Sequence, residues 1–326
     1  MAIADTGRAI GPETGSVVAV SPERRRRRRR QRLRHYGTVA AFMSPWIIGF
    51  LAFVLYPMLA SLYYSFTKYD LIQPPQWVGL ANYRFMIHDP SFWLAMRNTL
   101  WIIVFATPIQ VAFAIGTAVV LTRVRRGAGI YRTIFFLPTM VPAVAATLGF
   151  VFLLNPSGPI NRTLSFLHVP EPLWFQDPQF SKPALVILGL WGVGNTMIIF
   201  LAALLDVPKQ LYEAIEIEGA GPWQRFRHVT LPSISPVILF SLVIGVIYGF
   251  QYFTEGYIAA GGANDLGEPQ GSLLFYPIWL YQQGFQYFHM GYASAMAWVL
   301  FLIIMACTLV LIRTSKRWVH YQGGFR

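Results

Sequence analysis

Residues Tyr292–Ile312 read YASAMAWVLFLIIMACTLVLI, 21 positions without Asp, Glu, Lys, Arg or His. A helix needs about 20 mostly apolar residues to cross a bilayer, so this stretch predicts a transmembrane helix. Similar apolar blocks occupy five other parts of the chain: Val39–Ser65, Leu100–Leu121, Ile134–Leu154, Ala184–Leu205 and Val237–Ala259. The pattern predicts an all-α integral membrane protein with six transmembrane helices.

The composition agrees with this fold class. The 326 residues are 55% hydrophobic and 12% charged, whereas soluble proteins are about 25% charged. The single cysteine, Cys307, lies inside the last block and cannot form an internal disulfide.

The net charge of +12 includes the arginine run Arg24–Arg30. A nucleic-acid arm is one reading of this run. Its place just before the first block favours anionic lipid headgroups, and no nucleic-acid partner is expected.

The basic residues also assign the two sides of the membrane. With a cytoplasmic N-terminus, the inner segments hold 21 Lys and Arg residues and the outer segments hold 5. Positive residues concentrate on the cytoplasmic side, so both termini are expected there, in a multi-pass protein of the inner (plasma) membrane. No cleavable signal peptide is expected, because the first apolar block is too long for one.

The domain organisation follows from these patterns. Residues 1–36 are expected to be a disordered, basic, cytoplasmic segment, residues 37–315 the six-helix domain, and residues 316–326 a cytoplasmic tail. Proline and glycine interrupt the helical blocks. Such breaks favour a water-lined pathway or a simple fit between neighbouring helices. The positions are Pro57, Pro108, Pro138, Pro142, Gly192 and Gly194.

The segment between the fourth and fifth blocks has a pattern of its own. Residues 206–232 read DVPKQLYEAIEIEGAGPWQRFRHVTLP. The positions Leu211, Ala214, Ile215 and Glu218 have helical spacing, and they predict a short helix with a mainly apolar stripe. Gly219 or Gly221 would end this helix through a positive φ, and Pro222 suits the first turn of a second one.

The second short helix carries Trp223, Phe226 and Val229 at spacings of three, and Leu231-Pro232 is expected to close it before the fifth block. An amphipathic helix pair lies in the headgroup layer or docks into a groove of a partner protein. Anionic lipid would repel Glu213 and its two neighbours Glu216 and Glu218, so a protein partner is favoured.

These residues resemble a known family. Glu213-Ala214, Gly219 and Leu231-Pro232 have the spacing of the EAA loop of ABC importer permeases, here at about residues 206–235. Ile215, Val229 and Glu218 are conservative departures from its pattern. The resemblance implies a type I ABC importer permease fold and a loop that docks on a separate ATPase. The residues implied in ATPase coupling are Glu213, Ala214, Glu218, Gly219, Ala220, Leu231 and Pro232.

The resemblance covers residues 40–315 and points to the carbohydrate-uptake branch, of the maltose or glycerol-phosphate permease type. The segments that carry it are Trp77–Tyr83, Asp89–Thr99, Leu137–Pro142, Gly158–Asn161 and Leu211–Ala214. It implies three partners: a second homologous permease subunit, an ATP-binding cassette ATPase dimer and an extracytoplasmic solute-binding protein.

ATP hydrolysis is expected in another chain. No lysine follows a glycine in this sequence, so the G-K-[ST] core of a phosphate-binding loop is missing. The chain is therefore expected to be no enzyme and to hold no cofactor or metal, with ATP and magnesium bound by the partner ATPase.

Polar side chains at membrane depth are costly and tend to face the interior of a helix bundle. Thr139, Asn195 and Gln251 are such residues, with Trp191, Tyr248 and Tyr252 nearby. Their amides, hydroxyls and rings suit a sugar, although hydrogen bonds between helices, at about 0.6 kcal/mol each, are the alternative. Resemblance to the maltose permease places Thr139, Gly192, Asn195 and Gln251 at roughly matching contact positions, and the candidate substrate-binding set is completed by Tyr252.

No fixed charge is evident near mid-depth, and Glu255 is expected toward the outer end of the fifth helix. An uncharged mono- or oligosaccharide is therefore the favoured cargo. The alternative function is a secondary transporter or channel that works without ATP. That class predicts buried charges in the spans or an inverted repeat, and neither is evident. An intramembrane enzyme would need a nucleophile with a base, or metal ligands, at membrane depth.

Overall fold

The computed structural model describes residues 22–124, 126–262 and 269–320 of the chain. Two units are distinguished, one ending at Ala60 and the other beginning at Ser61. The boundary lies within the first helix of the domain expected over residues 37–315, and the bounds of that domain stay a prediction.

The first unit is helical throughout its described part. α1 (Pro22–Phe50) passes into the π turn η1 (Leu51–Leu55) and then into α2 (Tyr56–Ser65), which belongs to this unit as far as Ala60. The stretch Tyr36–Ser65 is long and apolar enough to span a membrane. The expectation of disorder over residues 1–36 is wrong from Pro22 onward. The physical reason is that arginine is a good helix former and the run continues directly into the first apolar helix; residues 1–21 lie outside the described part.

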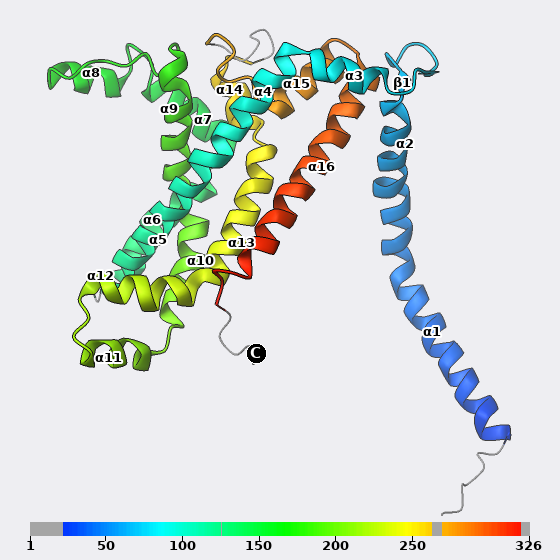
Figure 1. Ribbon diagram of the computed structural model, residues 1–326, viewed down its shortest axis with the longest axis horizontal. Helices are drawn as coiled ribbons and strands as arrows, with labels where there is room; N and C mark the ends of the chain where they lie inside the picture. Colours follow the sequence, from blue (N-terminus) through cyan, green and yellow to red (C-terminus); the bar gives the residue numbers. More distant parts are fainter. Residues whose placement is uncertain (1–21, 125, 263–268, 321–326) are drawn as a thin grey trace, which may run out of the picture. The chain divides into compact units, whose positions relative to one another are not determined.

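The second unit contains the remaining helices, with a two-stranded antiparallel sheet near its start that pairs Thr67 with Trp77 (Figure 1). Its elements up to the loop at residue 206 are β1 (Thr67–Lys68), β2 (Gln76–Trp77), α3 (Ala81–His88), α4 (Pro90–Trp101), η2 (Ile102–Ala106), α5 (Thr107–Arg123), α6 (Ala128–Phe136), η3 (Leu137–Met140), α7 (Ala143–Leu153), α8 (Pro159–Phe166), α9 (Pro178–Trp191) and α10 (Gly194–Leu205). The elements after it are α11 (Lys209–Ile217), α12 (Pro222–Arg225), η4 (Phe226–Thr230), α13 (Leu231–Phe250), α14 (Thr254–Ala259), α15 (Tyr276–Tyr281), η5 (Gln282–Gln286) and α16 (Met290–Ser315).

Four helical stretches of the described chain are long and apolar enough to span a membrane, and two bent pairs pass the same test. With each pair counted as one span, the chain has the six spans that the sequence predicts. The bends are 97° between Ala128–Met140 and Ala143–Leu153, and 52° between Pro178–Trp191 and Gly194–Leu205. The first lies at Pro138 and Pro142, and the second at Gly192 and Gly194, as the proline and glycine positions suggest.

The fifth span differs from the expectation. It covers Pro222–Phe250 rather than Val237–Ala259, so it begins earlier and ends earlier. Gln251 caps α13 with φ −105°, and α14 follows after a break of three residues. Hydropathy misses this break because Gln251, Thr254 and Glu255 are isolated polar residues in a stretch that is otherwise apolar or aromatic.

Three of the four π turns in the described chain precede a proline in the same way. Tyr56, Thr107 and Leu231 donate their N–H to the carbonyl five residues back, and the next residue in each case is Pro57, Pro108 or Pro232. Proline has no N–H to give to the preceding turn, and a π turn changes the hydrogen-bond register of a helix. Each helix therefore continues through its proline.

The core consists of two clusters in the second unit. The first joins α4, α9, α15 and α16 and contains the fully buried Phe275, Tyr276 and Met296. Burial raises the pKa of the Tyr276 hydroxyl, which donates to the Met296 carbonyl at 2.7 Å. The second joins α5, α10, η4 and the start of α13 around the fully buried Phe200 and Ile234. The first cluster supports the wall of a cavity, and the second supports the loop at residue 206.

A buried carboxylate ties together the elements of the first cluster. Asp89, 7% exposed, caps α4 by accepting from the Ser91 N–H at 2.9 Å. Its other oxygen accepts from the Trp279 indole at 2.9 Å and the Tyr292 hydroxyl at 2.8 Å. Nearby, the buried Asn98 amide donates to the Gly271 and Leu274 carbonyls. Long-range hydrogen bonds of this kind fix α15 against α4.

Replacement of Asp89 by alanine is expected to destabilise the protein. The change leaves two buried donors, on Trp279 and Tyr292, without their acceptor, at a cost of about 2–4 kcal/mol in the free energy of unfolding. Denaturant titration in detergent micelles measures this. The control is Glu171→Ala, which removes an exposed carboxylate. Equal stability of the two variants would contradict the structural role of Asp89.

Candidate functional site

A cavity of about 910 Å³ lies among the broken helices of the second unit. Its wall contains residues from η2, α5, η3, α7, α9, α10, α13 and α14. Polar side chains alternate there with aliphatic and aromatic ones. The polar members are Thr107, Gln110, Thr139, Thr147, Asn195, Thr196, Ser241, Tyr248, Gln251, Tyr252, Thr254 and Glu255.

The structure brings the predicted cargo residues together. The residues Thr139, Gly192, Asn195, Gln251 and Tyr252, which lie up to 113 positions apart in the sequence, all line this one cavity. The aromatic residues Trp191 and Tyr248 line it as well, with 40% and 68% of their surfaces exposed. Their shared position agrees with a common role, and contact with cargo stays a prediction.

Helix breaks place these side chains at the cavity. Gly192 caps α9, and Asn195 follows in the first turn of α10. Gln251 caps α13, and Tyr252 stands in the break before α14. Thr139 lies in the short 3₁₀ turn η3, where its hydroxyl donates to the Phe136 carbonyl at 2.7 Å.

Glycine allows the walls to meet closely at one of these breaks. A Cβ on Gly194 would lie 2.8 Å from the Phe136 Cα and 2.8 Å from the Thr139 Cγ2, which is too close for a real side chain. α10 therefore begins in direct contact with the end of α6, beside Thr139. Only glycine permits this approach.

Gln110 and Glu255 are among the lining residues that sequence reasoning did not assign to the cavity. Gln110 is polar within an apolar block, and this signal in the sequence could have identified it; its amide lies against Gly189. Glu255 was expected toward the outer end of the fifth helix; it lies on α14, after the end of α13, and it lines the cavity. α13 ends at Phe250, and the residues that follow it, Gln251 to Glu255, all belong to the cavity wall.

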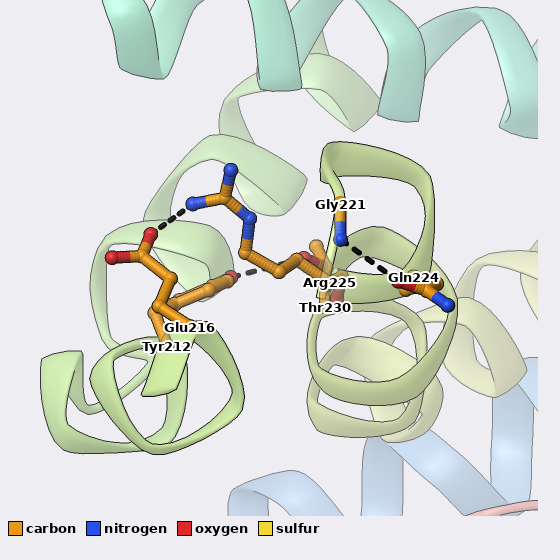
Figure 2. A network of polar contacts seen from close by, with 6 residues as sticks. All are labelled: Tyr212, Glu216, Gly221, Gln224, Arg225 and Thr230. Carbon is orange, nitrogen blue, oxygen red and sulfur yellow. Dashed lines mark hydrogen bonds and ion pairs between the residues drawn. The ribbon is translucent and has the colours of Figure 1, made fainter. Parts of the chain in front are cut away.

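The loop at residue 206 forms the expected two helices, α11 and α12. Gly219 has φ +81°, and it donates to the Glu216 carbonyl while Ala220 donates to the Ile215 carbonyl. These two bonds form a Schellman motif, the usual helix end at a left-handed glycine. Gly221 then precedes Pro222, and its N–H donates to the Gln224 side chain at 2.8 Å (Figure 2).

Two expectations for this loop are wrong. Leu231-Pro232 does not close the second helix, because the π turn η4 carries the helix on without a break to Phe250. The expected stripe on α11 is also divided: Ile215 is partly buried against the second core cluster, while Leu211 and Ala214 are exposed. The inward face is formed by Tyr212 with Ile215, since the loop packs against its own α12–η4 segment.

The predicted coupling residues are mostly accessible. Glu213, Ala214, Glu218 and Gly219 are exposed, whereas Ala220, Leu231 and Pro232 are half-buried. Large apolar side chains are also exposed on this loop, with Leu211 at 43%, Ile217 at 88% and Trp223 at 69%. The loop and the carboxyl end of α16 lie at the same end of the second unit, opposite to α14 and α15 (Figure 1).

Comparison with known proteins agrees with this geometry. Residues 110–320 match the model of the family described as binding-protein-dependent transport system inner membrane component. The probable ABC transporter permease protein YesP of Bacillus subtilis (strain 168) is 41% identical over 87% of this chain and 92% of its own length. The arabinooligosaccharides transport system permease protein AraP of the same organism is 32% identical over 84% of this chain and 87% of its own length.

A solved structure has the same fold. It is the crystal structure of a bacterial ABC transporter involved in the import of the acidic polysaccharide alginate, and one of its chains matches with a TM-score of 0.75 at 25% identity. The match covers 89% of this chain and 99% of that one. The fold is therefore that of a type I importer permease, a non-enzymatic membrane subunit. The chain belongs to the family of inner membrane components of binding-protein-dependent transport systems, and it is a permease subunit of an ABC importer.

Proposed function

We propose that this subunit forms half of the pathway for an uncharged sugar or oligosaccharide, and that the cargo passes through the cavity lined by Asn195 and Gln251. The observation that carries the proposal is the composition of this cavity. Amides and hydroxyls suit the hydroxyl groups of a sugar, and the rings of Trp191 and Tyr252 suit its C–H faces. A relative is named for arabinooligosaccharides, which are uncharged.

The charge of the cavity supports a neutral cargo. Of the described residues that line it, Glu255 alone carries a formal charge, and there is no Lys, Arg or His among them. A carboxylate in a partly desolvated wall repels anions more strongly than it would in water. Sugars with carboxylate or phosphate groups are therefore disfavoured.

Energy is proposed to come from a separate ATPase dimer, which binds ATP and magnesium. The permease docks on it through the α11–α12 loop, with Glu213, Ala214, Glu218, Gly219, Ala220, Leu231 and Pro232 in the coupling segment. The exposed Ile217 and Trp223 support a protein partner at this surface. A second, homologous permease and an external solute-binding protein complete the importer.

The proposed orientation places this loop and both termini in the cytoplasm. The excess of Lys and Arg in the inner segments supports it. The location of the loop at the same end of the second unit as the carboxyl end of α16 supports it as well (Figure 1).

The cargo class is tested on the complete importer in liposomes, with ATPase, both permeases and the solute-binding protein. Neutral sugars are offered beside amino acids, uronates and sugar phosphates. We expect ATP hydrolysis to be stimulated by a neutral sugar. Stimulation by the other classes, with none by a neutral sugar, would overturn the proposed cargo.

Replacement of Asn195 or Gln251 by alanine is expected to slow uptake. Each change removes an amide that a bound sugar would use, and a lost hydrogen bond of about 1 kcal/mol corresponds to a roughly fivefold loss. Initial rates of radiolabelled sugar uptake measure this. The control is Gln73→Ala, an exposed glutamine outside the cavity. Wild-type uptake by both variants would remove these amides from the pathway.

Replacement of Gly219 by aspartate is expected to abolish uptake, while the solute-binding protein still binds sugar. At φ +81° a side chain strains the backbone, by about 1 kcal/mol or more, and it disturbs the end of α11. The matched control is Gly221→Ala, because Gly221 has φ −70° and its nearest neighbour would be 3.9 Å from the new Cβ. Normal uptake by correctly inserted Gly219→Asp protein would contradict the coupling role.

A further inference from the structure

α11 is too short to hold its own direction. It has nine residues, and isolated helices shorter than about 12–15 residues are marginal in water. Its two connections are the turn at Val207-Pro208 and the glycine-containing segment Glu218–Gly221. Contacts with the following helical segment must therefore decide how α11 is oriented.

Two polar contacts join α11 to that segment (Figure 2). Glu216 forms an ion pair with Arg225, and the hydroxyls of Tyr212 and Thr230 hydrogen-bond at 3.0 Å. Tyr212 and Glu216 are four residues apart, so they lie on one face of α11. Both contacts are made from the same side of the helix, and together they resist its rotation.

The π turn makes both contacts possible. In an α-helix, residues five apart such as Arg225 and Thr230 differ in direction by about 140°, so they could not both face α11. In a π turn, residues five apart are hydrogen-bonded neighbours. η4 covers Phe226–Thr230, and the Thr230 hydroxyl lies 3.5 Å from the Arg225 carbonyl. The turn thus places Arg225 and Thr230 on one side.

We propose that Tyr212, Glu216, Arg225 and Thr230 are positioning residues, which fix α11 to the helix η4–α13 so that movement of the loop is transmitted to the fifth span. The inference rests on the proposed coupling function of this loop. It also gives Pro232 a role in coupling: the π turn that precedes this proline sets the register on which the contacts depend. The helix passes without a break from the loop to the cavity wall at Ser241 and Tyr248.

The contacts serve alignment rather than stability. The Glu216 and Arg225 side chains are 51% and 31% exposed, and exposed ion pairs contribute little to folding. Removal of the ion pair is therefore expected to leave the assembled importer intact, and after loss of the Tyr212 hydroxyl the buried Thr230 hydroxyl keeps the Arg225 carbonyl as its acceptor. Loss of alignment should instead lower the number of cargo molecules imported for each ATP hydrolysed.

The test compares variants of the complete importer in liposomes. Arg225→Ala combined with Tyr212→Phe removes both contacts, and we expect the ratio of sugar imported to ATP hydrolysed to fall about fivefold while the subunits still copurify. The matched control is Arg227→Ala, which removes an exposed arginine from the same segment and should keep the wild-type ratio.

A charge exchange gives a second measurement. Glu216→Arg and Arg225→Glu should each lower the ratio, and the double exchange should restore it. A wild-type ratio in the Arg225→Ala and Tyr212→Phe double variant, or no rescue by the exchange, would overturn the proposal. If instead the wild-type importer shows no link between ATP hydrolysis and uptake, the proposed function itself fails.

Discussion

A peptide group that leaves helical hydrogen bonding inside a bilayer must find a partner in protein or in enclosed water. Two of the spans are broken, at Pro138–Pro142 and at Gly192–Gly194, and the helix of a third ends at Phe250. All three interruptions line the same cavity. The breaks expose polar groups where a solute could use them, and the protein around the cavity shields them from lipid. The need to give these backbone groups hydrogen-bond partners explains why the cavity lies beside the helix breaks.

The connection between the α11–α12 loop and the cavity depends on an unbroken helix, in contrast to the helix breaks that line the cavity. The segment Pro222–Phe250 continues through Pro232 by means of a π turn, and it links the α11–α12 loop to the cavity wall. A stiff connection is needed if closure of an ATPase is to change the shape of the cavity. Shifting an equilibrium between two states from 1:99 to 99:1 takes about 5.5 kcal/mol of differential binding. A flexible connection between the loop and the cavity would let the loop move without changing the cavity.

Much of this could be predicted from the sequence. The hydropathy pattern located the six spans, because an uncharged apolar block as long as Tyr292–Ile312 is typical of a transmembrane helix. The spacing of Gly219 and Pro222 predicted the helix pair of the loop, because left-handed glycine and first-turn proline act locally. The polar residues Asn195 and Gln251 were found as exceptions within apolar blocks, and the structure places both at the cavity.

Other features depend on contacts that local patterns do not contain. The end of α13 at Phe250 is not visible in the hydropathy pattern, so the sequence did not show that Glu255 lines the cavity. The inward position of Ile215 depends on packing against η4. The ion pair between Glu216 and Arg225 depends on a π turn, which no residue type in the sequence predicts.

We propose that this chain moves cargo only when a separate ATPase drives it. The most direct test of this dependence measures sugar flux in liposomes that contain this subunit and its sister permease, first without and then with the ATPase, ATP and the loaded solute-binding protein. We expect accumulation against a gradient only in the complete system. Sustained, concentrative sugar uptake by the permeases without any nucleotidase would contradict it.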